Sequence, residues 1–176
     1  MNLLSKKISL LFLRYIILVI GGLGNLWIFY KLMTPITVYT SFFLLNLISH
    51  SQLIGQIIIF KNIAIELIPA CIAGSAYYLL VILNLSTPFD NFKTRIKALI
   101  FSCFILFILN ILRITLLAII YSPAFFNSVH FIMWQVLSTI FVVAIWIFSV
   151  FLFRIRNIPF YSDIRYLSKI VKKSSK

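Results

Sequence analysis

Acidic residues are almost absent from this 176-residue chain. Glu66, Asp90 and Asp163 are its only acids, against 16 Lys and Arg. Charged residues make up 11% of the sequence, whereas a soluble domain is about a quarter charged. This scarcity excludes a soluble enzyme and a disordered segment as descriptions of the chain.

Apolar residues are correspondingly abundant, at 62% of the sequence. One membrane span needs roughly 20 apolar residues, so the apolar content suffices for about five transmembrane helices. We therefore predict an all-α integral membrane protein in which residues 1–176 form a single membrane-embedded domain.

Cysteine is also scarce. Cys71 and Cys103 form no C-x-x-C pair and have no His/Cys spacing typical of a metal site. A disulfide-stabilised secreted scaffold is excluded, and zinc or disulfide-exchange chemistry is poorly supported. We predict no metal and no cofactor.

The net charge of +13 is concentrated in two places. Three basic residues lie close together at 93–97, and seven follow the last apolar run. This clustering follows the positive-inside rule and suits binding to anionic lipid headgroups, which favours a topological role over nucleic-acid binding. Loop 86–97 and the basic tail 154–176 are therefore expected in the cytoplasm.

Apolar runs predict five spans. They cover about residues 8–30, 34–51, 69–85, 98–121 and 128–153, with Thr34-Pro35 opening the second. Residues 54–69 are rich in β-branched side chains and alternate in polarity near their end, which predicts a short hairpin outside the bilayer.

The orientation of the first half stays open. Five full crossings place the N-terminus outside, and this topology is favoured. If residues 34–51 do not cross, the N-terminus lies inside, with Lys6, Lys7 and Arg14. Because Arg14 interrupts the first apolar run, we interpret that run as a retained helix rather than a cleaved signal.

Polar groups inside apolar helices are costly and are candidates for function. The strongest are Arg113 and Asn110 in the fourth predicted helix, His130 at the start of the fifth and Cys71 at the start of the third. The predicted topology places all four towards the outer face. Ser75 follows Cys71 by one turn and is a further candidate for lining the same site.

These side chains are the components of a cysteine acyl-transfer site, with a thiolate, a proton-transfer group and a cation that stabilises an oxyanion. Structural interpretations remain open. A lone cysteine at a helix start, such as Cys71, is more often a packing residue, and a histidine at a membrane interface, such as His130, is commonly an anchor. Arg113, within F-I-L-N-I-L-R-I-T-L-L, requires a partner or a polar cavity in either case.

Three motifs resemble the exosortase/archaeosortase family of membrane transpeptidases, over about residues 34–153. They are I-E-L-I-P-A-C-I-A-G-S with Cys71, N-I-L-R-I with Arg113, and V-H with His130. The resemblance implies a Cys71 nucleophile, an Arg113 oxyanion stabiliser and a His130 proton-transfer partner. The short chain is similar to compact archaeal forms such as pacearchaeosortases.

The resemblance also implies the substrates. They would be exported surface proteins that end in a recognition motif, a transmembrane helix and a basic cluster. Cleavage would occur on the outer face of the cell membrane, with transfer of the new carboxyl end to a lipid acceptor. The alternative is a non-enzymatic multi-pass membrane protein, either an assembly partner or a small transporter, in which Arg113 is structural.

Overall fold

The computed structural model describes residues 3–24, 26–87, 92–121, 126–133, 138–155 and 168. The chain is mostly helical, with one small antiparallel sheet inserted after the second helix. In chain order the elements are α1 (Leu3–Leu23), α2 (Trp27–Ile48), β1 (Ser51–Ile54), β2 (Ile57–Phe60), β3 (Ile63–Glu66), α3 (Pro69–Ile72), α4 (Gly74–Ser86), α5 (Phe92–Ile119), α6 (Phe126–Phe131) and α7 (Ser138–Leu152).

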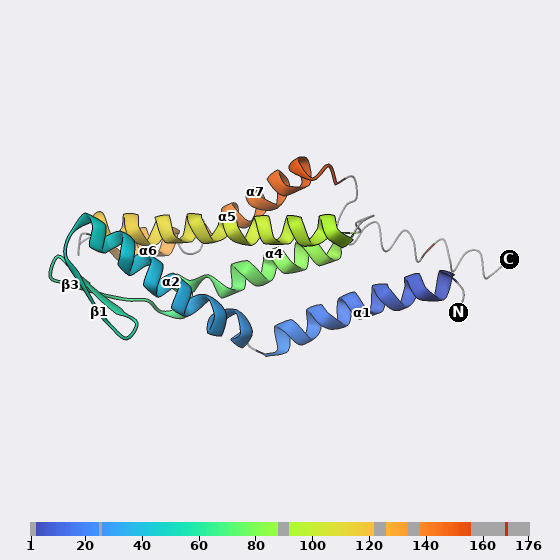
Figure 1. The fold of residues 1–176 in the computed structure, drawn as a ribbon, viewed down its shortest axis with the longest axis horizontal. Coiled ribbons are helices and arrows are strands. Elements are labelled where there is room, and N and C mark those ends of the chain that lie inside the picture. The colour runs from blue at the N-terminus through green and yellow to red at the C-terminus, as the bar shows by residue number, and fades with distance from the viewer. Residues whose placement is uncertain are drawn as a thin grey trace.

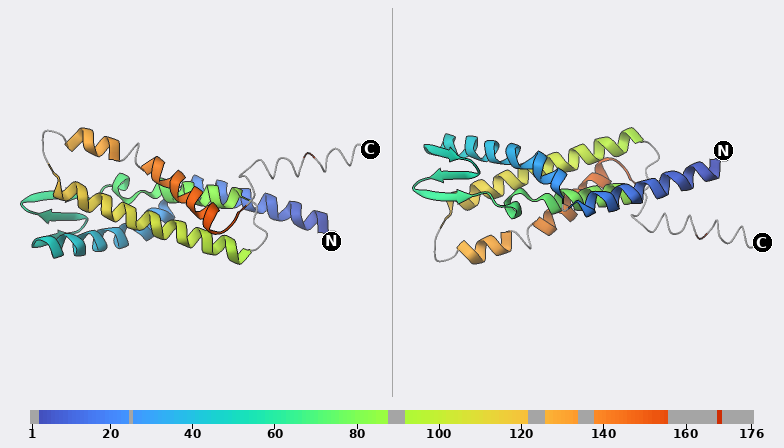
Figure 2. Two further views of the ribbon diagram at one scale, coloured as in Figure 1. Left: turned by 90° about the horizontal axis from the view of Figure 1, so that it is seen from above. Right: turned by 90° about the horizontal axis from the view of Figure 1, so that it is seen from below.

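The helices form an elongated bundle with the sheet at one end (Figure 1). α1 and α2 follow one another in the same direction, and α2 ends beside the sheet. α4 runs away from the sheet, α5 returns towards it, and α7 leads away again (Figure 2). α1 packs against α4, while α5 packs against α2, α4 and α7. α1 therefore begins at the end of the bundle opposite the sheet.

α2 and α5 are each long and apolar enough to cross a membrane, and shorter apolar helices occur in α1, α4 and α7. α5 has a buried side that includes polar residues and an exposed side that is apolar. Its buried side includes Ala98, Ser102, Leu106 and Asn110 at four-residue spacing. Its opposite side exposes Ile100, Phe104, Ile108, Leu112 and Leu116. A long helix with an apolar exposed side is compatible with membrane association. The predicted count of five spans is not confirmed.

The first two predicted helices have different limits in the structure. α2 begins at Trp27 and contains Pro35, so the prediction that Thr34-Pro35 opens a helix is wrong. The chain instead turns between α1 and α2, where Leu26 adopts a left-handed φ of 59°. Pro35 removes one backbone donor from α2, but the hydrophobic run on both sides of it maintains the helix.

The predicted hairpin is a three-stranded antiparallel sheet of order β1-β2-β3. β1 begins at Ser51, where the predicted second helix ended, and reaches Ile54, where the predicted hairpin began. A two-residue turn at Lys61 and Asn62, with φ of 48° and 65°, joins β2 to β3, as in a type I′ hairpin. The sheet packs on α2 and α5 through a core that includes Val38, Leu45, Ile58, Phe60, Leu67 and Ile114.

Two further predicted helices are divided. The third breaks at Ala73, whose φ of 60° ends α3 and precedes α4. At the start of α4, a Cβ added to Gly74 would lie 2.7 Å from the Tyr30 ring, so only glycine fits that approach. The fifth contains α6 and α7, and the segment 134–137 between them lies outside the described residues. Most of the predicted basic tail 154–176 also lies outside them.

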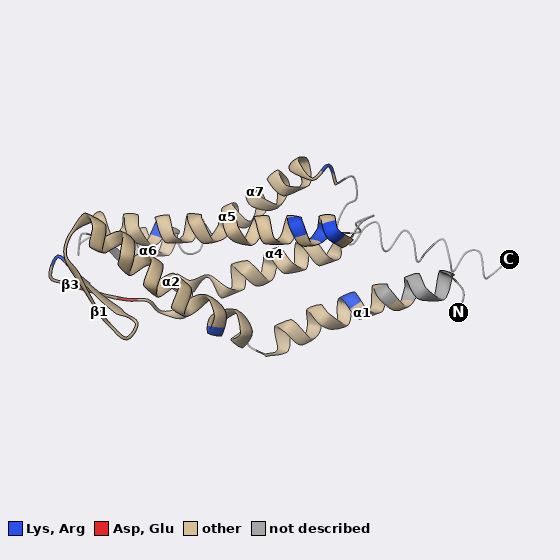
Figure 3. Cartoon of the chain, viewed as in Figure 1, with Lys and Arg blue, Asp and Glu red and all other residues tan. Residues whose placement is uncertain are grey.

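The basic residues of α5 mark the end of the bundle opposite the sheet. Lys93, Arg95 and Lys97 lie in the first turns of this helix, at the far end from β3 (Figure 3). The Arg95 guanidinium donates a hydrogen bond of 3.1 Å to the Thr87 carbonyl, just after α4. Because carbonyls at a helix C-terminus lack helical partners, this contact ties the start of α5 to the end of α4.

Candidate active site

Cys71 lies in α3, a single turn between the sheet and α4. Pro69 occupies the first turn of α3, where its missing N–H removes no helical bond. The backbone N–H of Cys71 donates to the Ile68 carbonyl at 2.8 Å. The left-handed residue Ala73 then redirects the chain into α4. This local geometry leaves Cys71 half-buried at the end of α3 nearest α5.

Asn110 and Arg113 bind the end of α3 from the buried side of α5. The Asn110 side-chain amide donates to the Cys71 carbonyl at 2.9 Å. Arg113 Nη2 donates to the carbonyls of Ala70 and Cys71 at 3.3 and 3.4 Å. Asn110 and Arg113 are only 3% and 6% exposed. They therefore satisfy carbonyls that a one-turn helix cannot pair internally.

Arg113 also contacts the segment that follows α6. Its Nη1 donates a hydrogen bond of 3.5 Å to the Met133 carbonyl. A guanidinium presents several N–H donors in a fixed plane, which allows one side chain to bind carbonyls from two segments. Arg113 thus joins α3, which carries Cys71, to the region just after His130.

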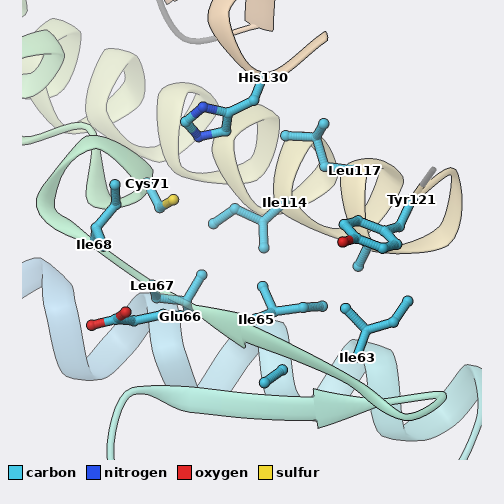
Figure 4. A pocket seen from close by; sticks show the side chains of 12 residues that line it. Ile63, Ile65, Glu66, Leu67, Ile68, Cys71, Ile114, Leu117, Tyr121 and His130 are labelled. Atoms are coloured by element: carbon cyan, nitrogen blue, oxygen red, sulfur yellow. The ribbon is translucent and has the colours of Figure 1, made fainter. Parts of the chain in front are cut away.

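Cys71 and His130 line the same cavity, which has a volume of about 300 Å³. Figure 4 shows the cavity between β3 and α5, with the His130 imidazole entering from α6 and the Cys71 sulfur from α3. Most of the lining is apolar; it includes Ile63, Ile65, Leu67, Ile114, Leu117 and Tyr121. The structure brings together Cys71 and His130, which are 59 positions apart in the sequence.

The surroundings of Cys71 act on its thiol in opposite directions. Burial raises the pKa of Cys71, and this is the largest effect, while the nearby Arg113 charge and the Ile68 backbone contact lower it. α3 lies outside both candidate spanning helices. The thiol is therefore the resting form at neutral pH, and its use as a nucleophile needs a base to accept its proton.

The other sequence candidates lie elsewhere. Ser75 is exposed in the first turn of α4 and is absent from the cavity lining. Cys103 packs in a second apolar cluster with Tyr77 and Leu106. Within the described ranges, no group of three or more His, Cys, Asp and Glu side chains is placed to hold a metal ion.

The sequence did not identify β3 as a wall of the cavity. Ile63, Ala64, Ile65 and Glu66 all contribute to the lining. Their alternation predicted a strand, and their nearness to Cys71 in the chain was the available signal. Closeness in the chain does not indicate which edge of the strand faces Cys71.

Comparison with known proteins gives no match: no protein-family model, curated protein or solved structure is significantly similar to this chain.

Proposed function

We propose that this chain is a membrane-embedded cysteine peptidase and transpeptidase. The observation that carries the proposal is the shared cavity of Cys71 and His130, together with the contacts of Arg113 to the backbone of Cys71. A nucleophile, a proton-transfer group and a fixed cation are the three groups that acyl transfer requires. The three motifs that resemble exosortases and archaeosortases support the same activity.

The proposed reaction begins when His130 accepts the Cys71 proton and the sulfur attacks a peptide carbonyl carbon. A C–S bond forms, and the carbonyl π electrons move to oxygen. Collapse of this intermediate breaks the C–N bond, and the amine leaves with the proton returned by His130. An acceptor hydroxyl, amine or water then attacks the thioester, gives its proton to His130 and displaces the thiolate, which recovers that proton.

Arg113 has two roles in this proposal. Its donors hold the Ala70 and Cys71 carbonyls, which orients α3, and its charge lies close enough to Cys71 to lower the free energy of the thiolate. The same charge would stabilise the oxyanion formed on the substrate, as in the resembling family. Asn110 positions Cys71 through its hydrogen bond to the Cys71 carbonyl and does not contact the substrate in this mechanism.

We propose that the sheet end of the bundle, and hence the cavity, faces the outside of the cell membrane. Lys93, Arg95 and Lys97 lie at the opposite end, where the positive-inside rule places the cytoplasm. α1 and α2 run in the same direction (Figure 2), which favours the N-terminus on the cytoplasmic side. In this topology α1 and α2 together make one pass, followed by α4, α5 and α7.

The substrates we propose are surface proteins with a C-terminal motif, a transmembrane helix and a basic cluster, and the acceptor is a lipid. This assignment rests on the family resemblance. A helix of the substrate beside the bundle would deliver an adjoining extended segment to a cavity at the outer face.

The test is thiol labelling of intact cells with a membrane-impermeant maleimide, in a Cys103→Ser background. Labelling should depend on Cys71 and should slow by about tenfold or more in His130→Ala, because the base is lost. His50→Ala is the matched control, since His50 is exposed and lines no part of the cavity. An equal rate in His130→Ala would contradict the proposed base.

A structural role for Arg113 is the second candidate, because its hydrogen bonds to Ala70, Cys71 and Met133 are all made to backbone carbonyls. Arg95 provides a comparison, as it binds the Thr87 carbonyl in the same way. If Arg113 is catalytic, Arg113→Lys lowers Cys71 reactivity much more than it lowers stability, whereas Arg95→Lys lowers only stability. Parallel losses of stability and reactivity in Arg113→Lys would favour the non-enzymatic membrane protein.

A further inference from the structure

β3 is an edge strand whose second edge faces the candidate active site. Along the described chain, β2 pairs with β3 on one side, and no strand pairs with β3 on the other. Figure 4 shows Cys71, His130 and Ile114 across the cavity from this second edge, with the neighbouring strand on the far side of β3. The backbone of β3 therefore borders the cavity that contains the nucleophile.

The register identifies the backbone groups of β3 that point away from β2. Phe60 pairs with Ile63 across the two-residue turn, and Ile58 pairs with Ile65. Because paired residues of an antiparallel hairpin alternate between hydrogen-bonded and non-hydrogen-bonded positions, Ala64 lies at a non-hydrogen-bonded position opposite Ile59. Both the N–H and the C=O of Ala64 consequently point away from β2.

Glu66 is the next residue of β3 whose backbone groups point away from β2, and one of these two groups already has a partner. Glu66 also lies at a non-hydrogen-bonded position, opposite Ile57, but its carbonyl accepts a hydrogen bond of 3.2 Å from the Ile68 N–H. This bond turns the chain from β3 towards Pro69 and Cys71. Ala64 thus offers a donor and an acceptor, and Glu66 a donor, on the edge that leads to the nucleophile.

We propose that β3 binds the substrate by adding an extended peptide as a fourth strand, bonded to the backbone of Ala64. This inference rests on the proposed peptidase function and states how that site selects its substrate. Strand addition supplies affinity through main-chain hydrogen bonds, and the pockets for alternate side chains supply selectivity. An added strand lies about 4.8 Å from β3, on the side where Cys71 is found.

The cavity indicates the chemistry of the peptide. Its walls are mainly isoleucine and leucine side chains, and its volume of about 300 Å³ is small. Among the lining residues, Glu66 is the one Asp, Glu, Lys or Arg, and Figure 4 shows its carboxylate directed away from the Cys71 sulfur. The bound segment is therefore uncharged, extended and composed of small apolar residues.

The test uses the purified full-length Cys103→Ser protein in detergent and two electrophiles. One is acetyl-Ala-Val-Ala vinyl sulfone, and the other is methyl vinyl sulfone, which has no peptide backbone. Each reacts when the Cys71 sulfur bonds to the terminal vinyl carbon and a proton is added at the carbon next to the sulfone. The measured quantity is the ratio of the two alkylation rates at Cys71.

Ala64→Pro removes the outward N–H without removing a bond of the β2–β3 ladder. We expect the rate ratio to fall about fivefold or more, as one lost hydrogen bond implies. Ala64→Val retains the N–H and is the matched comparison, so its ratio should stay clearly above that of Ala64→Pro. An unchanged ratio in Ala64→Pro overturns the inference while leaving the peptidase proposal intact.

A second measurement tests the inference even if the Ala64→Pro variant does not fold. On the parent protein, the peptide probe is methylated at one backbone nitrogen at a time. Strand addition predicts that methylation lowers the alkylation rate only at every second nitrogen of the probe. An equal effect at all nitrogens, or no effect, overturns the inference. If Cys71 reacts with neither electrophile in the parent, the proposed peptidase function fails, and this inference fails with it.

Discussion

The side-chain amide of Asn110 donates a hydrogen bond of 2.9 Å to the backbone carbonyl of Cys71, 39 positions earlier in the chain. Asn110 is buried in α5, and Cys71 lies in the single turn of α3. A polar side chain in an apolar helix thus fixes the backbone of the candidate nucleophile. The bond couples the longest helix of the bundle to the shortest.

Replacing Asn110 should affect both stability and reactivity. Asn110→Ala removes one donor to the Cys71 carbonyl, which Arg113 still contacts, so we expect a loss of about 1 kcal/mol in the free energy of unfolding. The alkylation rate of Cys71 should also fall, because α3 is less firmly oriented. Denaturant titration in detergent measures the first effect and maleimide kinetics the second.

Asn84→Ala is the control for this change. Asn84 is buried in α4 and lines no part of the cavity. We expect its replacement to leave Cys71 alkylation unchanged, whatever its effect on stability. Equal loss of alkylation in both variants would mean that general loosening of the bundle, and not the contact with α3, controls the thiol.

The pH dependence of Cys71 alkylation follows from its surroundings. Burial raises the pKa of this thiol, so the rate should keep rising with pH beyond about 8.5, where an exposed cysteine is half ionised. Because the Arg113 charge lowers the same pKa, Arg113→Gln should move the midpoint of the profile to still higher pH. The measurement is the rate of reaction with iodoacetamide across pH, in the Cys103→Ser background. A midpoint that moves down in Arg113→Gln would contradict the assignment.

Gly74 should tolerate no side chain. In Gly74→Ala the new Cβ would meet the Tyr30 ring at 2.7 Å, forcing the ring or the start of α4 to move. We expect a destabilisation of about 1–3 kcal/mol, typical of overpacking. Tyr30→Leu should partly relieve it in the double variant. Gly24→Ala is the control, since a Cβ there meets nothing within 4 Å. Equal destabilisation of the two alanine variants would rule out the contact with Tyr30 as the cause.

Single cysteines test the proposed topology in a Cys71→Ser, Cys103→Ser background. Lys61→Cys, at the exposed turn of the sheet, should react with impermeant maleimide in intact cells, whereas Lys93→Cys should react only after permeabilisation. Ser9→Cys in α1 should behave like Lys93→Cys if α1 and α2 make a single pass. Reaction of Ser9→Cys in intact cells would instead support the five-crossing topology.

The candidate site was recognisable in the sequence because its residues are exceptions to their surroundings. Arg113 and Asn110 interrupt an apolar run, and burying such groups requires partners. Position along each predicted helix also placed them towards the end that carries Cys71 and His130. The structure places Cys71 and His130 on one cavity. Asn110 and Arg113 bind the Cys71 carbonyl without lining that cavity, and all four catalytic roles stay a prediction.

The limits of the elements were less predictable where long-range packing decides them. Pro35 is a common first residue of a helix, yet it lies inside α2 because the hydrophobic run on both sides packs as one helix. The break at Ala73 has no glycine signal at its left-handed position. It is imposed by the contacts of α5 with the end of α3 and by the fit of Gly74 against Tyr30.

The sequence by itself determined the apolar composition, the helical runs, the strand-like alternation before Cys71 and the basic cluster at 93–97. It assigned that cluster to a loop, whereas the structure places it in the first turns of α5. These properties depend on residue type and local spacing, which need no knowledge of distant neighbours. Only the tertiary structure decided that α1 and α2 run in one direction, that Arg113 binds the Ala70 and Cys71 carbonyls, and that β3 faces the cavity. Each of these depends on how distant segments pack, and no local periodicity encodes which carbonyl a buried guanidinium reaches.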